Sequence, residues 1–165
     1  FDDFELNYAD NGLYNSGGEN GSNSPSDWNT WASSGTPFTW DNTTFNTGKR
    51  SLKINNISSQ YACWYSDMTN LQISKEYEFG GWIKTSNVGV GSQGAEIQAI
   101  AMDSNGNWIG AQITSVLSGT NNWTYVTGRI TLPPMTQKVQ LQAQLYGVNG
   151  TAWFDDMFIR LVDKS

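Results

Sequence analysis

Hydrophobic and polar residues alternate over short segments along most of the chain, most clearly between Val139 and Gly147. In this segment, VQLQAQLYG, the odd-numbered positions are apolar up to Leu145, and the even-numbered positions are three glutamines and Tyr146. A period of two is typical of a β-strand, whose side chains point alternately to opposite faces. The segment is therefore predicted to be a strand with one apolar face on a core and one face of amides ending in an aromatic ring.

Similar alternating segments recur between breaks rich in Gly, Asn and Pro, and helical periodicity is hard to find. The candidate strands span residues 51–54, 60–66, 76–85, 94–103, 107–116, 122–132, 138–147 and 151–162. Asn105-Gly106 is expected to form a hairpin turn, because this pair tolerates positive φ angles. Pro133-Pro134 is expected to end a strand, because proline lacks an amide donor. Eight or more strands with little helix predict an all-β antiparallel sandwich, or jelly roll.

Residues 11–48 have a different composition, rich in Gly, Ser, Asn and Thr, and contain three tryptophans. We interpret this region as long loops around one or two short strands. A tryptophan in such a loop is ordered either by packing under it or by a ligand. Packing is favoured for Trp31 and Trp40, whereas Trp28 is a candidate ligand contact. The length of 165 residues suits one domain, residues 1–165.

Charge and residue counts exclude several classes of function. A formal net charge of -6 makes nucleic acid and anionic membrane poor partners. The absence of histidine excludes a His-based catalytic triad or zinc site. The single cysteine, Cys63, alternates with tyrosines and is expected to be a buried small hydrophobic residue. No apolar run approaches the ~18 residues of a membrane helix.

The polar residues are mostly neutral, and eight tryptophans are present. This composition suits a surface that faces sugars, and it equally suits ordinary secreted β-proteins. The composition alone decides little between these two; the expected location is secreted or cell-surface in either case. Because the chain begins at Phe1 instead of methionine, we expect a mature or excised fragment.

Several phrases occur in a fixed order: DDFE, SDWNTW, GKRSLKI, YEFGGWIKT, DSNGNWIG, GTNNWTYV and GTAWFDDMFI. Together they resemble the jelly-roll carbohydrate-binding modules of the superfamily that contains families 4, 9, 16 and 22, most of all family 16. The resemblance implies about ten strands in two sheets, five on five, with one concave face that holds a glycan chain.

The resemblance also implies a structural calcium ion that joins the first and last strands. Its ligands fall on the carboxylates of Glu5 and Asp155 and on backbone carbonyls near Lys49 and Asp3. Calcium prefers six to eight oxygen ligands, which such a set can supply. Alternation with Met157 predicts that Asp155 points inward, where a carboxylate needs a partner. The alternative is that these acids are solvated at strand ends.

Three predicted strands carry amides at outer positions, because isoleucine, leucine, valine or alanine occupies the alternating inward positions. The amides are Gln98, Gln112, Gln140, Gln142 and Gln144. An amide both donates and accepts hydrogen bonds, as the vicinal hydroxyls of a neutral sugar require. If the strands share the concave sheet, these side chains line one cleft. The alternative is a solvated sheet face without a ligand.

A sugar site also needs aromatic rings, because the C–H faces of a pyranose are apolar and stack on them. Tyr146 shares the side of Gln142, and Trp28 lies in a loop. The resemblance to family 16 supports this pairing of a loop tryptophan with an aromatic on the last strand. Related families use an aromatic after SLKI, which implies Trp64 or Tyr61.

The leading hypothesis is a non-catalytic, monomeric module that binds a neutral β-glycan, cello- or manno-configured or glucomannan. It targets an attached glycoside hydrolase to polysaccharide by proximity. One alternative is a structural or adhesion domain of a larger surface protein. Another is a catalytic jelly-roll hydrolase or lyase, which needs two carboxyl groups across a cleft. Glu76, Glu78 and Glu96 are the glutamates in or near mid-chain strands, and alternation does not exclude a Glu78–Glu96 pair.

Overall fold

The computed structural model describes residues 11–162, which form an all-β structure without helices. No helix in this part of the chain could therefore span a membrane. The strands are β1 (Asn29–Ala32), β2 (Phe38–Asp41), β3 (Ser51–Met68), β4 (Glu76–Val88), β5 (Ala95–Met102), β6 (Trp108–Ile113), β7 (Gly119–Thr131) and β8 (Lys138–Leu161). All pairings are antiparallel. The predicted fold class is confirmed.

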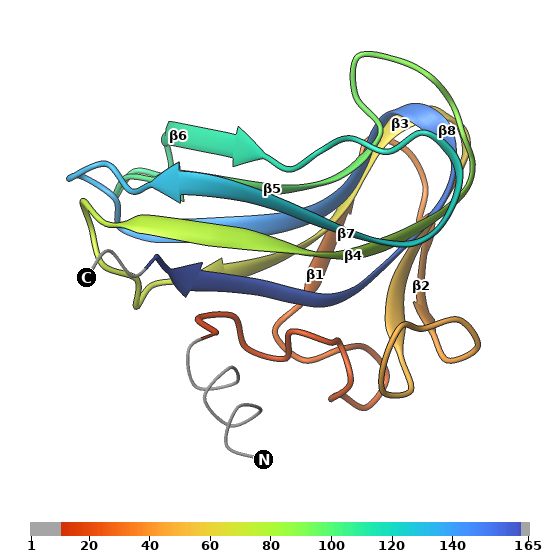
Figure 1. Ribbon diagram of the computed structural model, residues 1–165, viewed down its shortest axis with the longest axis horizontal. Coiled ribbons are helices and arrows are strands. Elements are labelled where there is room, and N and C mark those ends of the chain that lie inside the picture. The colour runs from red at the N-terminus through yellow and green to blue at the C-terminus, as the bar shows by residue number, and fades with distance from the viewer. Residues whose placement is uncertain (1–10, 163–165) are drawn as a thin grey trace.

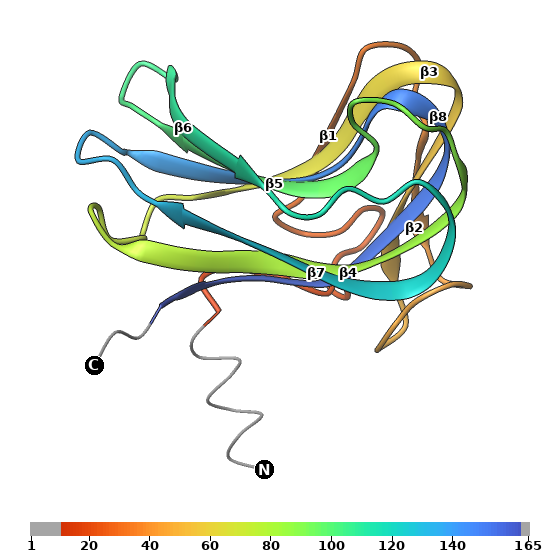
Figure 2. The same cartoon turned by 45° about the horizontal axis from the view of Figure 1, so that its top comes forward.

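Two long bent strands, β3 and β8, run through both layers of the sandwich. One layer, here called the amide sheet, has the order β1–β3–β8–β5–β6 and uses residues 61–68 of β3 and 139–146 of β8. The other, the opposite sheet, has the order β2–β3–β8–β4–β7 and uses the remaining parts of both strands. Figures 1 and 2 show the layers facing each other, joined through β3 and β8 at one end. Within residues 11–162, each layer therefore has five strand segments.

The bends in β3 and β8 explain why the sequence predicts four strands where the structure has two. Residues 51–54 and 60–66 both belong to β3, and residues 138–147 and 151–162 both belong to β8. At the bend of β3, the buried Asn56 donates its side-chain N–H groups to the carbonyls of Leu145 and Val148. On β8, Gly147 and Gly150 have positive φ angles of 73° and 126°. A Cβ atom at Gly150 would lie 2.6 Å from a backbone carbon of Val88, so only glycine fits there. The sequence breaks mark corners within continuous strands.

The core lies between the two sheets and includes Phe79, Ile83, Leu141 and Phe154, all fully buried. On β8 the core side is the apolar side of VQLQAQLYG, as alternation predicts. The hairpin between β5 and β6 and the end of β7 before Pro133 are also confirmed.

Two tryptophans that the sequence suggested as sugar contacts belong to this core. Trp28 and Trp64 are each only 5% exposed. The indole N–H of Trp28 donates to the carbonyl of Asn15 (2.9 Å), and that of Trp64 donates to the carbonyl of Lys53 (3.1 Å). Trp64 also packs edge-on against Phe38. Both rings fill the sandwich with their polar atoms satisfied, so we withdraw them as candidate ligand contacts.

Candidate functional site

The outward side of the amide sheet, here called the amide face, carries a set of side chains that strand register aligns across β3, β8 and β5. Partners directly opposite each other in antiparallel strands point to the same side. Gln142 is the partner of both Tyr65 and Gln98. Gln140 is likewise the partner of Ile100 on β5. The structure thus brings Gln98, Gln140, Gln142 and Tyr146 onto one face, as their alternation predicts.

Gln112 is a correction, because it does not share this face. Its partner on β5 is Ala99, whose side chain is in the core, whereas Gln98 is opposite Ile113. The prediction assumed that the isoleucine points inward. However, β6 is an edge strand, and Ile113 is 45% exposed on the outer side. The side chains of Gln112 and Ile113 therefore point to the sides opposite to those predicted.

We expect Gln112→Ala to leave glycan affinity within about twofold of the unmodified chain, because its side chain lies on the far side of the sheet from Gln98. Titration calorimetry of the variant against the same oligosaccharide measures this. A loss of affinity of tenfold or more would contradict the register of β6 against β5.

A hollow of about 220 Å³ lies on the amide face and is lined by Trp31, Cys63, Tyr65, Gln140 and Gln142. Trp31 is the partner of Cys63, so the pairing of β1 with β3 brings its indole ring to this face. The ring is 51% exposed. Loop packing was favoured for Trp31 from the sequence, and that interpretation is wrong. In the sequence, the segment NTWA is the signal for the strand that carries Trp31. The Gly and Ser residues around it made this segment look like a loop.

The amides in the hollow form a directed hydrogen-bond chain. Gln140 Nε2 donates to Asp67 Oδ1 (2.9 Å), and Gln142 Nε2 donates to Gln140 Oε1 (2.7 Å). The hydroxyl of Tyr146 donates to Gln142 Oε1 (2.9 Å). The chain fixes which end of each amide is nitrogen, because Asp67 can only accept when ionised. Each amide is thereby oriented, and these bonds leave a second N–H and a second oxygen lone pair on each unused; Gln142 itself is only 5% exposed.

Tyr146 orients the amides more than it offers a stacking surface. Its ring is half-buried and meets Tyr61 edge-on, with 5.3 Å between ring centroids. Burial raises the pKa of the Tyr146 hydroxyl, and neighbouring Cys63 adds to this effect, so the hydroxyl remains a neutral donor. Trp31 is therefore the exposed ring at the hollow, with Tyr65 beside it.

A protein-family model described as "Carbohydrate binding domain" (CBM_4_9) matches residues 10–149. The chain belongs to this carbohydrate-binding family. This confirms the predicted superfamily of jelly-roll modules, without singling out family 16. No curated protein matches the module.

Solved structures with the same fold share little sequence with the module. A family 61 module, TmCBM61, in complex with β-1,4-galactotriose is 16% identical over 92% of this chain and 99% of its own (TM-score 0.60). The CBM22-1 xylan-binding domain of Paenibacillus barcinonensis Xyn10C is 17% identical over 90% and 93% (TM-score 0.59). The enzymatically active domain of bacteriophage CBA120 tailspike protein 4 is 12% identical over 93% of this chain (TM-score 0.71), and the module spans only 22% of it.

One end of the module's amide face holds an unusual buried pair, Glu96 and Gln144, both fully buried. Glu96 Oε1 accepts a hydrogen bond from the amide N–H of Gly94 (3.2 Å). Glu96 Oε2 and both amide atoms of Gln144 make no hydrogen bond of normal geometry, but the Gln144 amide lies close enough to Glu96 to lower the pKa of its carboxyl. Burial raises the pKa of Glu96, and the N–H groups of Gly94 and Gln144 only partly offset this. Burial likewise raises the pKa of the Cys63 thiol to about 11, which leaves an unreactive cysteine.

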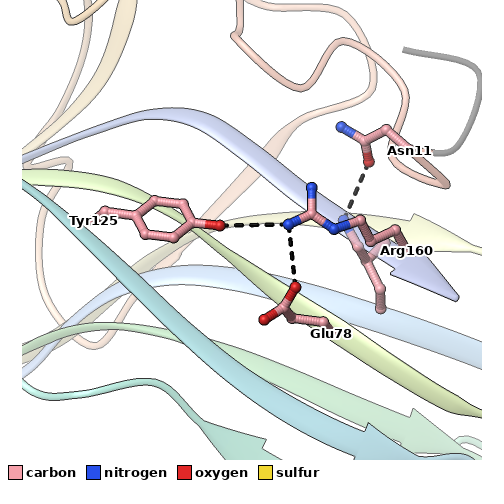
Figure 3. Close-up of polar contacts among 5 residues, drawn as sticks. Asn11, Glu78, Tyr125 and Arg160 are labelled. Carbon is pink, nitrogen blue, oxygen red and sulfur yellow. Dashed lines mark hydrogen bonds and ion pairs between the residues drawn. The ribbon is translucent and has the colours of Figure 1, made fainter. Parts of the chain in front are cut away.

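Glu78 and Glu96 do not form a catalytic pair across a cleft. Glu96 lies on the outer side of the amide sheet, opposite Gln144. Glu78 is the partner of Arg160 and lies on the outer side of the opposite sheet. Figure 3 shows the Arg160 guanidinium contacting both Glu78 (3.1 Å) and the hydroxyl of Tyr125 (3.4 Å). The whole sandwich separates Glu78 from Glu96, so they cannot act on one glycosidic bond.

The calcium ligands implied by the family are only partly within residues 11–162, because Asp3 and Glu5 lie outside the described residues. The amide N–H of Lys49 donates to Glu19 Oε2 (2.8 Å). Asp155 is fully buried, and its Oδ2 accepts hydrogen bonds from the backbone N–H groups of Asn46 and Thr47. The part of the chain that the structure describes contains no group of three metal-ligating side chains.

The prediction that Asp155 points inward is wrong. Asp155 is the partner of Trp82, and the adjacent Phe154 is in the core. A bulge at Asp156, with φ of 50°, breaks the alternation between Asp155 and Met157. Asp155 is buried on the outer side, where it binds the amides of the loop before β3. Burial and the charge of Asp156 raise the pKa of Asp155 to about 7.

Proposed function

We propose that the module binds a neutral β-glycan chain along the amide face and has no catalytic role. The observation that carries this proposal is the hollow in which the exposed indole of Trp31 lies beside the oriented amides of Gln140 and Gln142. The preferred ligands are cello- or manno-configured chains, including glucomannan. The module acts as a monomer outside the cell and holds an attached glycoside hydrolase near its polysaccharide.

The charges around the hollow support a neutral ligand. Its five lining residues carry no formal charge. Asp67 at the rim is engaged by Gln140 and lies 3.6 Å from the ammonium group of Lys138. Amide groups that both donate and accept suit vicinal hydroxyls, whereas an anionic sugar would need a cation in the hollow. The galactotriose bound by TmCBM61 is likewise a neutral glycan.

Titration calorimetry with soluble cello-, manno- and glucomanno-oligosaccharides tests this function. We expect heat of binding with at least one series and little change in affinity between low and high salt, because no ion pair is involved. The absence of heat with every neutral β-glycan would overturn the proposal and favour a structural domain of a larger surface protein.

We also propose a structural calcium ion beside Asp155 and Asp156. A Cβ atom at Gly17 would lie 3.6 Å from both Asp156 Oδ1 and Glu19 Oε1, so these two carboxylates border one space. Within residues 11–162, no lysine or arginine forms an ion pair with Glu19, Asp155 or Asp156. A calcium ion would offset this negative charge. Remaining ligands would come from backbone oxygens and from the predicted Asp3 and Glu5.

Calcium is therefore expected to raise the melting temperature of the module by a few degrees, because a ligand of the folded state stabilises it. Thermal unfolding followed by circular dichroism, with chelator and with added calcium, measures the shift, and magnesium is the control ion. Glycan affinity should be the same in both conditions. An identical melting temperature with and without chelator would count against the ion.

A further inference from the structure

A second and larger hollow, of about 380 Å³, lies at the bend of β3, against the connection between β1 and β2. Its walls are residues 34–39 on one side and residues 55, 57, 58 and 60 of β3 on the other. In Figure 1 this region is the end of the sandwich where β2 runs beside β3. The volume is at the small end of the range for ligand pockets.

Gln60 presents an acceptor with no partner in this region. Its Nε2 donates to Asn56 Oδ1 (3.1 Å), and Asn56 in turn uses its own N–H groups on the carbonyls of Leu145 and Val148. The amide of Gln60 cannot be reversed, because Asn56 Oδ1 requires a donor. Gln60 Oε1 is buried and has no hydrogen-bond partner. A buried carbonyl oxygen without a partner is unfavourable unless a ligand or water supplies a donor.

The rest of the lining matches a small neutral molecule with hydroxyl groups. Ser34, Thr36, Thr39 and Ser58 contribute hydroxyls that both donate and accept. None of the lining residues carries a formal charge. Ile57 lies at the hollow with 88% of its surface exposed, an unusual position for an isoleucine within a strand. It provides an apolar contact for the C–H face of a sugar ring.

This hollow is separate from the one on the amide face. The two share no lining residue. The register of β3 against β8 shifts between Gln60 and Tyr61, where the strand passes from one sheet to the other. Tyr61 therefore belongs to the amide sheet beside Tyr146, whereas Gln60 belongs to the bend.

We propose that the hollow at the bend is a second ligand site that holds one neutral sugar unit, as a chain end or a side branch. The choice of a sugar as ligand rests on the proposed carbohydrate-binding function. The small volume and the uncharged lining with its hydroxyl-bearing side chains determine the ligand class. A branched polysaccharide could then contact the module at both sites, with a gain in avidity.

Two-dimensional NMR of the ¹⁵N-labelled module, with methyl glycosides of glucose, galactose, mannose and arabinose at millimolar concentration, tests this site. We expect the side-chain amide of Gln60 and the backbone amides of residues 34–39 to shift with at least one of the four. Ser58→Trp should weaken that binding at least tenfold by filling the hollow. Ser59→Trp is the matched control, because Ser59 is also exposed but does not line the hollow.

If none of the glycosides shifts the bend while an oligosaccharide shifts the amide face, the second site is overturned and the proposed function remains. If neither surface responds to any neutral sugar, both proposals fail. Equal effects of Ser58→Trp and Ser59→Trp on binding, with unchanged melting temperatures, would also contradict the assignment.

Discussion

Trp31→Ala should weaken binding of a neutral β-glycan by between tenfold and a hundredfold. The indole is 51% exposed over the hollow, and its backbone is fixed by the pairing of β1 with β3. Stacking a sugar on it would bury about 100 Å² of apolar surface, roughly half of what a large aromatic side chain buries in a core. At about 25 cal/mol per Å² this amounts to ~2.5 kcal/mol. Titration calorimetry measures the loss.

Tyr14→Ala is the matched control for this prediction. Tyr14 is even more exposed, at 60%, but it lies in the segment before β1 and lines neither hollow. Its removal should leave affinity unchanged. Because Trp31 is on the surface, both variants should keep the melting temperature of the parent chain. If Trp31→Ala binds as tightly as Tyr14→Ala, the stacking surface has been assigned to the wrong ring.

Glu96→Gln should stabilise the module by about 2 kcal/mol near pH 8, the cost of burying a charged or unsatisfied polar group. Glu96 is fully buried, and the N–H groups of Gly94 and Gln144 do not offset the cost of burying its charge. Glutamine keeps an oxygen for the bond from Gly94 and adds an N–H group beside the unpaired carbonyl oxygen of Gln144. The variant therefore removes a buried negative charge and can satisfy an orphan acceptor.

The gain should depend on pH in a defined direction. The folded-state pKa of Glu96 lies above its value in the unfolded chain. Its contribution to stability is complete below the unfolded pKa, near 4.3, and is lost as pH rises through the folded pKa. Denaturant unfolding of both proteins between about pH 5 and pH 8 measures the difference. The advantage of the variant should grow with pH.

Glu78→Gln is the control for the loss of a carboxylate. Glu78 is ion-paired with the partly exposed Arg160 on the other side of the sandwich, so its replacement should cost less than about 1 kcal/mol. An advantage of Glu96→Gln that is the same at both ends of the pH range would contradict a charge effect. A loss of stability near pH 8 would show that the hydrogen bonds from Gly94 and Gln144 to ionised Glu96 outweigh the cost of burying its charge.

Alternation in the sequence is enough to place the central strands of the candidate site. Gln98, Gln140 and Gln142 are on one face because β5 and β8 have neighbours on both sides, so their apolar residues must face the core. The same reasoning fails for Gln112, because an edge strand can leave isoleucine in solvent. It also fails for Asp155, because a bulge at Asp156 changes the side to which the chain points.

The tryptophans before β3 could not be sorted from the sequence. Trp28 and Trp31 are three residues apart in the same Ser- and Asn-rich segment, yet one is in the core and the other lies at the hollow. What separates them is the pairing of β1 with β3, which depends on contacts between residues 30 to 36 positions apart in sequence. Local composition carries no information about such a pairing.

The most direct test of the central claim is an NMR titration of the ¹⁵N-labelled module with the oligosaccharide that binds best in calorimetry. The indole N–H of Trp31 and the side-chain amides of Gln140 and Gln142 report on the hollow itself. The account predicts that these signals shift together and saturably, while the buried indole N–H of Trp28 does not. Saturable binding that leaves all three unchanged would contradict the assignment of the site to the amide face.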